Sequence, residues 1–263
     1  MSTPSGTEPT VVVHPDADVL AAAVAARLLS SLADAQARKG HASVVLTGGG
    51  TGIAVLEHLR HSPARDAVDW SRLDVYWGDE RFVPAADDDR NEKQARAALL
   101  DHVPIDESRV HPMAASDAAF GDDPDAAASA YADVLAASAR SASTATGAVR
   151  VPSFDVLLLG LGGEGHTASI FPASPAVREN TATVVAVRDC PKPPPTRLSL
   201  TLPAIRAAEE VWLLTAGEAK ADAVALALAG ADEVSLPVAG AKGKRRTVWL
   251  IDRAAAAKVQ PTR

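Results

Sequence analysis

The stretch Phe154-Asp-Val-Leu-Leu-Leu-Gly-Leu-Gly-Gly-Glu-Gly-His-Thr-Ala-Ser-Ile-Phe-Pro172 says the most about the fold. Its apolar run at residues 156–159 is typical of a strand buried on both faces, as in a parallel sheet. Glycines follow at positions 160, 162, 163 and 165, and glycine lets a backbone approach a ligand closely or adopt positive φ. Open α/β sheets bind ligands at the carboxyl ends of such strands. The stretch therefore predicts an α/β fold with a ligand site directly after this strand.

Strand and helix patterns alternate along the rest of the chain. Further strands are expected at residues 10–13, 43–46, 73–77, 183–187, 197–202, 210–214 and 247–251. Helices are expected from Asp16, at residues 53–59 and 91–100, from Pro124, and at residues 220–228. Alternating leucines at residues 197–202 favour a half-buried strand. This order predicts a Rossmann-like α/β fold with a mostly parallel sheet, helices on both faces and a small antiparallel addition.

The bulk properties are those of an ordinary globular protein. The chain has 263 residues, of which 47% are hydrophobic and 22% charged, enough for a sizeable core. We predict one domain over residues 1–263, with residues 1–9 flexible. The small polar residues at 141–147 are interpreted as a surface loop within that domain, because the alternation resumes after them. No large exposed apolar helix face stands out, so a monomer is expected.

Charge and cysteine usage narrow the partners and the compartment. The net charge is −7 and the one basic run lies at residues 242–246, so no nucleic-acid partner is expected. Cys190 is the single cysteine, which excludes an intrachain disulfide and suits a reducing cytoplasm. No apolar run reaches the about 18 residues needed to span a bilayer, and residues 1–10 lack an apolar signal core. We therefore predict a cytoplasmic protein without a membrane partner.

The glycine-rich stretch also matches a dinucleotide-binding fingerprint, as Gly160-Leu-Gly-Gly-Glu-Gly165. That motif needs a long helix after the third glycine and an acidic residue after the next strand. Pro172 and Pro175 oppose such a helix, whereas Asp189 does follow the next strand. The fingerprint is half met, and we predict that no nicotinamide or other cofactor is bound.

His166 is the best catalytic candidate in the stretch. An unperturbed imidazole titrates near neutral pH, as a general base requires. Glu164, two residues earlier, either orients His166 or faces solvent. Asp79, just past another buried strand, is a second acid that can position a base or bind a sugar hydroxyl. The other six histidines have no metal-ligand spacing, so no metal site is expected.

Glycines and cations near other strand ends favour an anionic ligand. The run Thr47-Gly-Gly-Gly-Thr-Gly52 lies between a strand and a helix, where backbone N–H groups hold anions. It lacks the Gly-Lys-Ser/Thr ending of a Walker A loop. Arg81 offers bidentate donors that suit phosphate, and Arg197 and Lys220 lie near other expected strand ends. Each of these cations is equally consistent with an exposed surface charge.

Taken together, these residues resemble the 6-phosphogluconolactonase family, within the larger group that includes glucosamine-6-phosphate isomerase/deaminase. The motifs, in order, are Thr47-Gly-Gly-Gly-Thr51; Trp77-Gly-Asp-Glu-Arg-Phe-Val-Pro84 with Asn91 downstream; residues 160–172; Pro194-Pro-Thr-Arg-Leu-Ser-Leu-Thr201; and Gly217-Glu-Ala-Lys220. Members of the family more widely carry Asp-Gly-His where this chain has Glu164-Gly-His166. The deaminase branch continues its Gly-His with Ala-Phe-Asn-Glu-Pro, whereas this chain continues with Thr167-Ala-Ser-Ile-Phe-Pro172, which favours the lactonase.

The resemblance implies a NagB-type fold and hydrolysis of 6-phospho-D-glucono-1,5-lactone to 6-phosphogluconate in the oxidative pentose phosphate pathway. It implies that His166 activates water, with Glu164 or Asp79 as its partner. The substrate contacts expected with it are Gly48, Gly49, Gly50, Thr51, Arg81, Asn91, Ser169, Arg197 and Lys220. Two alternatives stay open: a glucosamine-6-phosphate isomerase/deaminase on the same scaffold, and a non-catalytic sugar-phosphate sensor.

Overall fold

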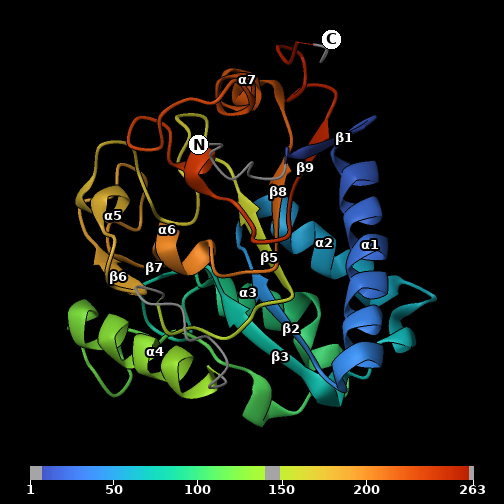
Figure 1. The fold of residues 1–263 in the computed structure, drawn as a ribbon. Coiled ribbons are helices and arrows are strands. Elements are labelled where there is room, and N and C mark those ends of the chain that lie inside the picture. Colours follow the sequence, from blue (N-terminus) through green and yellow to red (C-terminus); the bar gives the residue numbers. More distant parts are fainter. Residues whose placement is uncertain (1–7, 140–148, 261–263) are drawn as a thin grey trace, which may run out of the picture.

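A six-stranded parallel sheet lies at the centre of the computed structural model, which describes residues 8–139 and 149–260 (Figure 1). Its strand order is β1-β9-β8-β5-β2-β3, and every neighbouring pair is parallel. The strands are β1 (Thr10–His14), β2 (Ala42–Leu46), β3 (Leu73–Trp77), β5 (Val156–Gly160), β8 (Glu210–Thr215) and β9 (Arg246–Asp252). The predicted loop at residues 141–147, and most of the predicted flexible segment 1–9, lie outside the described residues.

The central strands β2, β5 and β8 consist mostly of apolar residues because both faces of the sheet are covered. Every residue of β2 and β8 is buried, as are residues 156–159 of β5, which confirms the prediction for that run. From β2 the chain continues to β3 on one side, whereas from β5 it continues to β8 and β9 on the other. The direction of winding therefore reverses between β2 and β5, and this is where open α/β sheets bind ligands.

Helices cover both faces, as predicted (Figure 1). One face packs against α1 (Ala17–Lys39), α2 (Gly49–His61) and α3 (Asn91–Ala98). The second hydrophobic cluster lies on the other face with α4 (Pro124–Ser138), α5 (Pro175–Arg178), α6 (Leu202–Ile205) and α7 (Ala221–Leu228). Asp16 caps α1 as expected, accepting a hydrogen bond from Val19 N at 2.9 Å. No helix in the described ranges has both the length and the apolar character to cross a membrane.

A small antiparallel sheet, in the order β4-β7-β6, packs beside these helices. Its strands are β4 (Asp79–Arg81), β6 (Val184–Val187) and β7 (Arg197–Leu200). The prediction of a half-buried strand at residues 197–202 was wrong, because all four residues of β7 are buried. Leu198 and Leu200 join the hydrophobic cluster. The polar face is also covered, since Arg197 and Ser199 bond to neighbouring loops.

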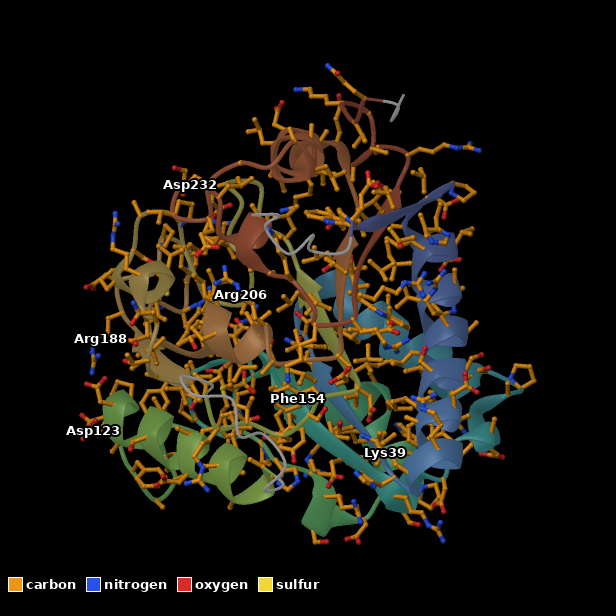
Figure 2. All side chains as sticks on the ribbon, in the orientation of Figure 1. Lys39, Asp123, Phe154, Arg188, Arg206 and Asp232 are labelled. Carbon is orange, nitrogen blue, oxygen red and sulfur yellow. The ribbon has the colours of Figure 1, made fainter. Side chains whose placement is uncertain are left out.

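A buried aromatic pair lies in the interior, and two polar contacts attach α4 to its surroundings. Phe154 is buried in the interior, in an edge-on contact with Tyr76 at 5.2 Å between ring centroids (Figure 2). The Tyr131 hydroxyl of α4 accepts a hydrogen bond from Trp77 N at the end of β3 (3.1 Å). At the periphery, Arg188 after β6 pairs with Asp125 of α4 at 2.6 Å.

Candidate active site

The glycine turn after β5 brings Glu164 and His166 close to the backbone. The turn is closed by two hydrogen bonds, from Gly162 N to the His166 carbonyl (2.9 Å) and from Gly165 N to the Gly162 carbonyl (3.0 Å). A Cβ atom at Gly162 would lie 1.9 Å from His166 Nδ1, which no side chain permits. Glycine at 162 is therefore required for the imidazole to pack on the turn.

A short chain of charged contacts surrounds the imidazole. Glu164 Oε1 lies 2.9 Å from His166 Nδ1, and Glu164 Oε2 accepts a hydrogen bond from Lys192 Nζ at 3.0 Å. The contact to Nδ1 is close, but it lacks the alignment of a hydrogen bond. The imidazole packs on the Phe171 ring, with 4.6 Å between centroids. Of the two acids left open by the sequence, Glu164 is the one that contacts His166.

The surroundings favour a neutral imidazole and an ionised carboxylate. Burial lowers the pKa of His166 and the positive charge of Lys192 lowers it further, while the Glu164 carboxylate acts in the opposite direction. Burial disfavours the charged form of Glu164. Its own backbone N–H, Lys192 and His166 outweigh that effect and lower the pKa of Glu164 to about 2. A neutral imidazole beside a carboxylate can accept a proton at neutral pH, as a general base must.

Asp79 lies deeper, on β4 of the small sheet. It is 6% exposed, and its Oδ2 accepts a hydrogen bond from Ser169 Oγ at 2.7 Å. Ser169 is held in turn by a bond from its backbone N to Ser199 Oγ (3.2 Å). The Asp79 carbonyl accepts from Asn91 Nδ2 at 2.9 Å. Three of the predicted site residues, Asp79, Asn91 and Ser169, are thus joined in one buried network.

The predicted anion-binding glycines begin helix α2 instead of forming a loop ahead of it. The helix starts at Gly49, and Gly48 at its N-cap provides no side-chain hydrogen bond to the first turn. The first-turn N–H groups, from Gly49 to Thr51, thus have no side-chain cap, and uncapped N–H groups at a helix start are the kind of donor that binds anions. A Cβ atom at Gly48 would lie 1.9 Å from Asn91 Oδ1. The amide of Asn91 therefore packs directly on this helix end.

The predicted cations differ in how many hydrogen bonds their side chains already make within the protein. Arg197 is 5% exposed, and its guanidinium donates to the carbonyls of Lys192 (2.9 Å), Pro193 and Pro194. It holds the loop that places Lys192 beside the glycine turn. The Nη1 atom of Arg81 donates to the Asp89 carbonyl at 2.6 Å.

Lys220 ends the short 3-10 helix η5 (Glu218–Lys220) after β8. Burial and the repulsion of Lys192 lower the pKa of Lys220, whereas Glu164 raises it, so these three side chains act on one another electrostatically. Sequence reasoning missed Lys192, although its position just before three prolines and close to Arg197 was the available signal.

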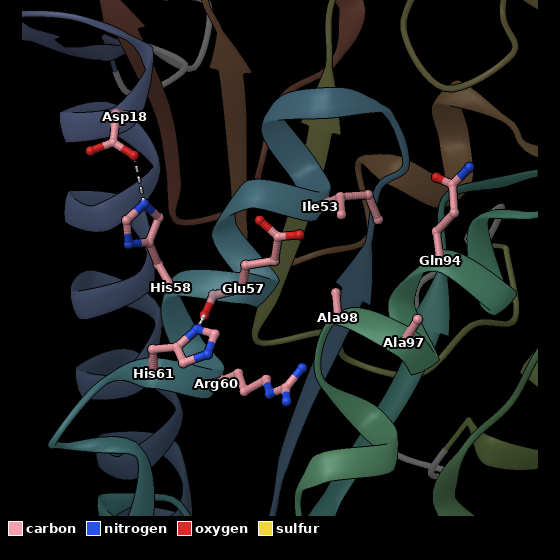
Figure 3. Close-up of a pocket in the computed structure, with 9 residues that line it drawn as sticks. All are labelled: Asp18, Ile53, Glu57, His58, Arg60, His61, Gln94, Ala97 and Ala98. Carbon is pink, nitrogen blue, oxygen red and sulfur yellow. Dashed lines mark hydrogen bonds and ion pairs between the residues drawn. The ribbon is translucent and has the colours of Figure 1, made fainter.

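A second group of titratable side chains lines a hollow between α1, α2 and α3 (Figure 3). Its imidazoles are already engaged: His58 Nε2 contacts Asp18 Oδ1 at 3.1 Å, and His61 Nδ1 contacts the Glu57 carbonyl at 2.8 Å. On α2 the hollow is lined by residues from Ile53 to His61, which follow the glycines of its first turn. Within the described residues, no cluster of three or more His, Cys, Asp or Glu side chains has the arrangement of a metal site.

Comparison with known proteins shows which family the chain belongs to. The family described as glucosamine-6-phosphate isomerases/6-phosphogluconolactonase matches residues 15–249. The chain belongs to this family. A Streptomyces coelicolor protein named 6-phosphogluconolactonase is 59% identical over 251 residues, covering 95% of each chain. A protein of the same name from Mycobacterium tuberculosis is 56% identical, covering 95% of this chain and 98% of its own.

Solved structures of the isomerase/lactonase family share the fold. The 6-phosphogluconolactonase of Trypanosoma brucei superposes with a TM-score of 0.81 at 29% identity, covering 97% of this chain and all of its own. A monomeric glucosamine-6-phosphate deaminase superposes with a TM-score of 0.75 at 19% identity, covering 95% and 99%. The first comparison agrees with the lactonase motifs of the sequence, and the second concerns the fold alone. The predicted fold class and family are both confirmed.

Proposed function

We propose that this protein is a 6-phosphogluconolactonase, which hydrolyses 6-phospho-D-glucono-1,5-lactone to 6-phosphogluconate in the oxidative pentose phosphate pathway. The observation that carries the proposal is that His166, whose pKa is lowered, lies on the turn after β5, while the neighbouring strand β2 leads into the uncapped start of α2. The two are neighbours because β5 and β2 pair directly. A phosphorylated lactone needs these two features, an anion-binding group and a base for water. Relatives with that name, at 56–59% identity over nearly the full chain, support the same activity.

In the proposed reaction His166 accepts a proton from a water molecule as the water oxygen attacks the lactone carbonyl carbon C1. The carbonyl oxygen becomes an oxyanion, which backbone N–H groups of the glycine turn stabilise. The tetrahedral intermediate then collapses, the bond between C1 and the ring oxygen breaks, and the imidazolium returns its proton to that oxygen. The product is the open-chain acid. Glu164 keeps the imidazole oriented and stabilises its charged form between the two steps.

The phosphate is proposed to bind among the cations and backbone donors around the turn. The helix end at residues 48–51 supplies N–H groups, and Arg81, Arg197 and Lys220 supply positive charge. In a chain of net charge −7, local concentration of positive groups is what attracts an anionic substrate. Asn91, Ser169 and Asp79 are proposed to contact or position the sugar hydroxyls.

The test is turnover of lactone generated in situ from glucose-6-phosphate, followed as 6-phosphogluconate release above the spontaneous rate. Enzyme-dependent release is expected from the wild type. Glucosamine-6-phosphate serves as the rival substrate, with ammonia as the readout. Ammonia release without lactone hydrolysis would overturn the proposal in favour of the isomerase/deaminase. Binding of 6-phosphogluconate without either reaction would favour a sensor.

The organisation of the molecule in solution stays a prediction. We propose one domain over residues 1–263, a monomer, and a cytoplasmic location. Light scattering on a size-exclusion column tests the monomer, for which a mass near 27.1 kDa is expected. A mass of twice that value would contradict it.

A further inference from the structure

Glu80 is a buried acid in the middle of β4 for which the proposed mechanism has no role. Its side chain is 0% exposed, and a carboxylate is rarely buried unless hydrogen bonds or an opposite charge compensate for the loss of water. It accepts hydrogen bonds from three backbone N–H groups: those of Arg81 (2.8 Å), Asn91 (2.7 Å) and Glu92 (2.9 Å). The Arg90 guanidinium, itself 2% exposed, lies 3.9 Å away.

Two of the three donors belong to the first turn of helix α3. That helix begins at Asn91, and Arg90 at its N-cap offers no side-chain hydrogen bond. The first N–H groups of a helix need an outside acceptor, and the positive end of the helix dipole favours an anion there. Glu80 meets both needs from a different element, so it caps α3 across the gap between β4 and the helix.

The capped residue Asn91 belongs to the proposed substrate site. Its backbone N–H is held by Glu80, and its side-chain Nδ2 donates to the Asp79 carbonyl. Its Oδ1 is buried without a hydrogen-bond partner and lies where a Cβ atom of Gly48 would be. An unpaired acceptor beside the helix end that is proposed to bind the phosphate suits a hydroxyl group of the same ligand. Its position depends on where the first turn of α3 is held.

We propose that Glu80 is a positioning residue of the active site: by capping α3 from β4, it holds Asn91 against the helix end at Gly48 and fixes the position of its unpaired Oδ1 acceptor there. The expected change in kcat/KM rests on the proposed function, whereas the capping of α3 by Glu80 does not. Substrate contact is assigned to Asn91, and Glu80 acts through it.

The charged groups around Glu80 determine the pH at which a test is run and the control variant that it needs. Burial raises the pKa of Glu80 to about 7, while Arg90 and the three N–H donors oppose that rise. Kinetics at pH 8 therefore keep the wild-type carboxyl mainly ionised. Glu92 also contacts Arg90, at 3.0 Å, but it accepts none of the three backbone bonds. Glu92→Gln is thus a matched control that removes a carboxylate from Arg90 and leaves the cap intact.

The experiment compares Glu80→Gln with Glu92→Gln at 25 °C, under conditions where both are fully folded. A glutamine at 80 keeps one acceptor oxygen but turns an NH₂ group toward a donor. We expect a loss of about tenfold or more in kcat/KM for Glu80→Gln, the scale of one lost hydrogen bond to a charged group. For Glu92→Gln we expect a change within about twofold. A residue that only stabilised the fold would lower the melting temperature and leave kcat/KM of the folded protein unchanged.

A double-mutant cycle with Asn91→Ala tests whether the effect passes through Asn91. The two losses in kcat/KM are expected to be strongly non-additive, with the double variant close to the Asn91→Ala single variant. Additive losses would overturn the proposal. So would wild-type kcat/KM in folded Glu80→Gln, or an equal loss in Glu92→Gln. If Glu80→Gln does not fold, Glu80→Asp, which keeps the charge but not the reach, replaces it with the same expectations.

Amide hydrogen exchange separates this proposal from the proposed function. Faster exchange is expected at the Asn91 and Glu92 amides of Glu80→Gln than in the wild type, with no substrate present. Unchanged exchange would overturn the cap. If the wild type fails to hydrolyse the lactone, the proposed function fails, and the exchange result still decides whether Glu80 holds the first turn of α3.

Discussion

Replacing Glu164 by glutamine tests the electrostatic part of the site. The substitution keeps the shape of the side chain and removes a negative charge whose Oε1 atom lies 2.9 Å from His166 Nδ1. The carboxylate stabilises the imidazolium form, so its loss lowers the pKa of His166 further. A general base works only when deprotonated. The acidic limb of kcat/KM against pH must therefore move to lower pH in Glu164→Gln.

The size of this shift follows from Coulomb's law and the exposure of the pair. Unit charges about 4 Å apart interact by about 1 kcal/mol in water and about 4 kcal/mol at an effective dielectric constant of about 20. The Glu164 side chain is 36% exposed and that of His166 is 14% exposed, which places the pair nearer the weaker limit. About 1.4 kcal/mol corresponds to one pKa unit. We expect the limb to move down by about one pH unit.

Lys192→Met supplies the opposite perturbation. It removes the positive charge 3.0 Å from Glu164 Oε2, so the carboxylate acts on His166 without compensation and the limb is expected to move up, by less than one unit. The assay follows lactone generated in situ between pH 5 and 8, with spontaneous hydrolysis subtracted at each pH. Movement of both variants in the same direction, or no movement in Glu164→Gln, would refute the reasoning.

Three further substitutions test packing and hydrogen bonding around the site. Gly162→Ala places a methyl group 1.9 Å from the present His166 Nδ1, so kcat/KM is expected to fall by about a hundredfold or more while the fold, measured by circular dichroism, stays intact. Ser169→Ala removes the 2.7 Å hydrogen bond to buried Asp79 and should cost about 1–3 kcal/mol in denaturant unfolding; a neutral result would mean that Asp79 finds another donor. Leu157→Ala in β5, where the side chain is 0% exposed, should lower the free energy of unfolding by about 2–5 kcal/mol with little change in kcat/KM measured below the transition.

Much of the large sheet could be predicted because strands that are buried on both faces are rich in apolar residues, which can be recognised in the sequence. Residues 156–159 are apolar without interruption since β5 is covered on both faces, and the prediction was confirmed. Asp16 was recognisable as a cap because a short polar side chain precedes an apolar helical pattern. By contrast, the alternation in β7 predicts a strand exposed on one face, and all of β7 is buried. Its polar residues face protein loops, and a pattern of period two does not say whether water or protein lies on the polar side.

Site residues could be predicted where glycines and charged residues occur together in the sequence. They were missed where only tertiary contacts bring a residue to the site. Glycines at 48 and 162 stood out in the sequence, and the structure explains them by the close approach of Asn91 and His166. Lys192 enters the site only because the Arg197 guanidinium holds its loop by carbonyl contacts. The sequence shows Lys192 before three prolines and close to Arg197, but not that this loop reaches the glycine turn.

Glu80 was overlooked for a related reason. It sits between Asp79 and Arg81 in a run of charges that, by itself, is typical of an exposed loop. Its partners are the backbone N–H group of the next residue and two others 11 and 12 residues further along the chain. Almost every residue has a backbone N–H group, whatever its side chain. A carboxylate that binds backbone N–H groups therefore cannot be recognised from the spacing or composition of the sequence.

The most direct test of the central claim is the rate of 6-phosphogluconate release from in situ generated lactone by the wild type and by His166→Ala. The account predicts release well above the spontaneous rate for the wild type, and a loss of about a hundredfold or more for the variant, as expected when a general base is removed. Wild-type turnover that survives in a folded His166→Ala would contradict the assignment of the base. No turnover by folded wild type would contradict the lactonase itself.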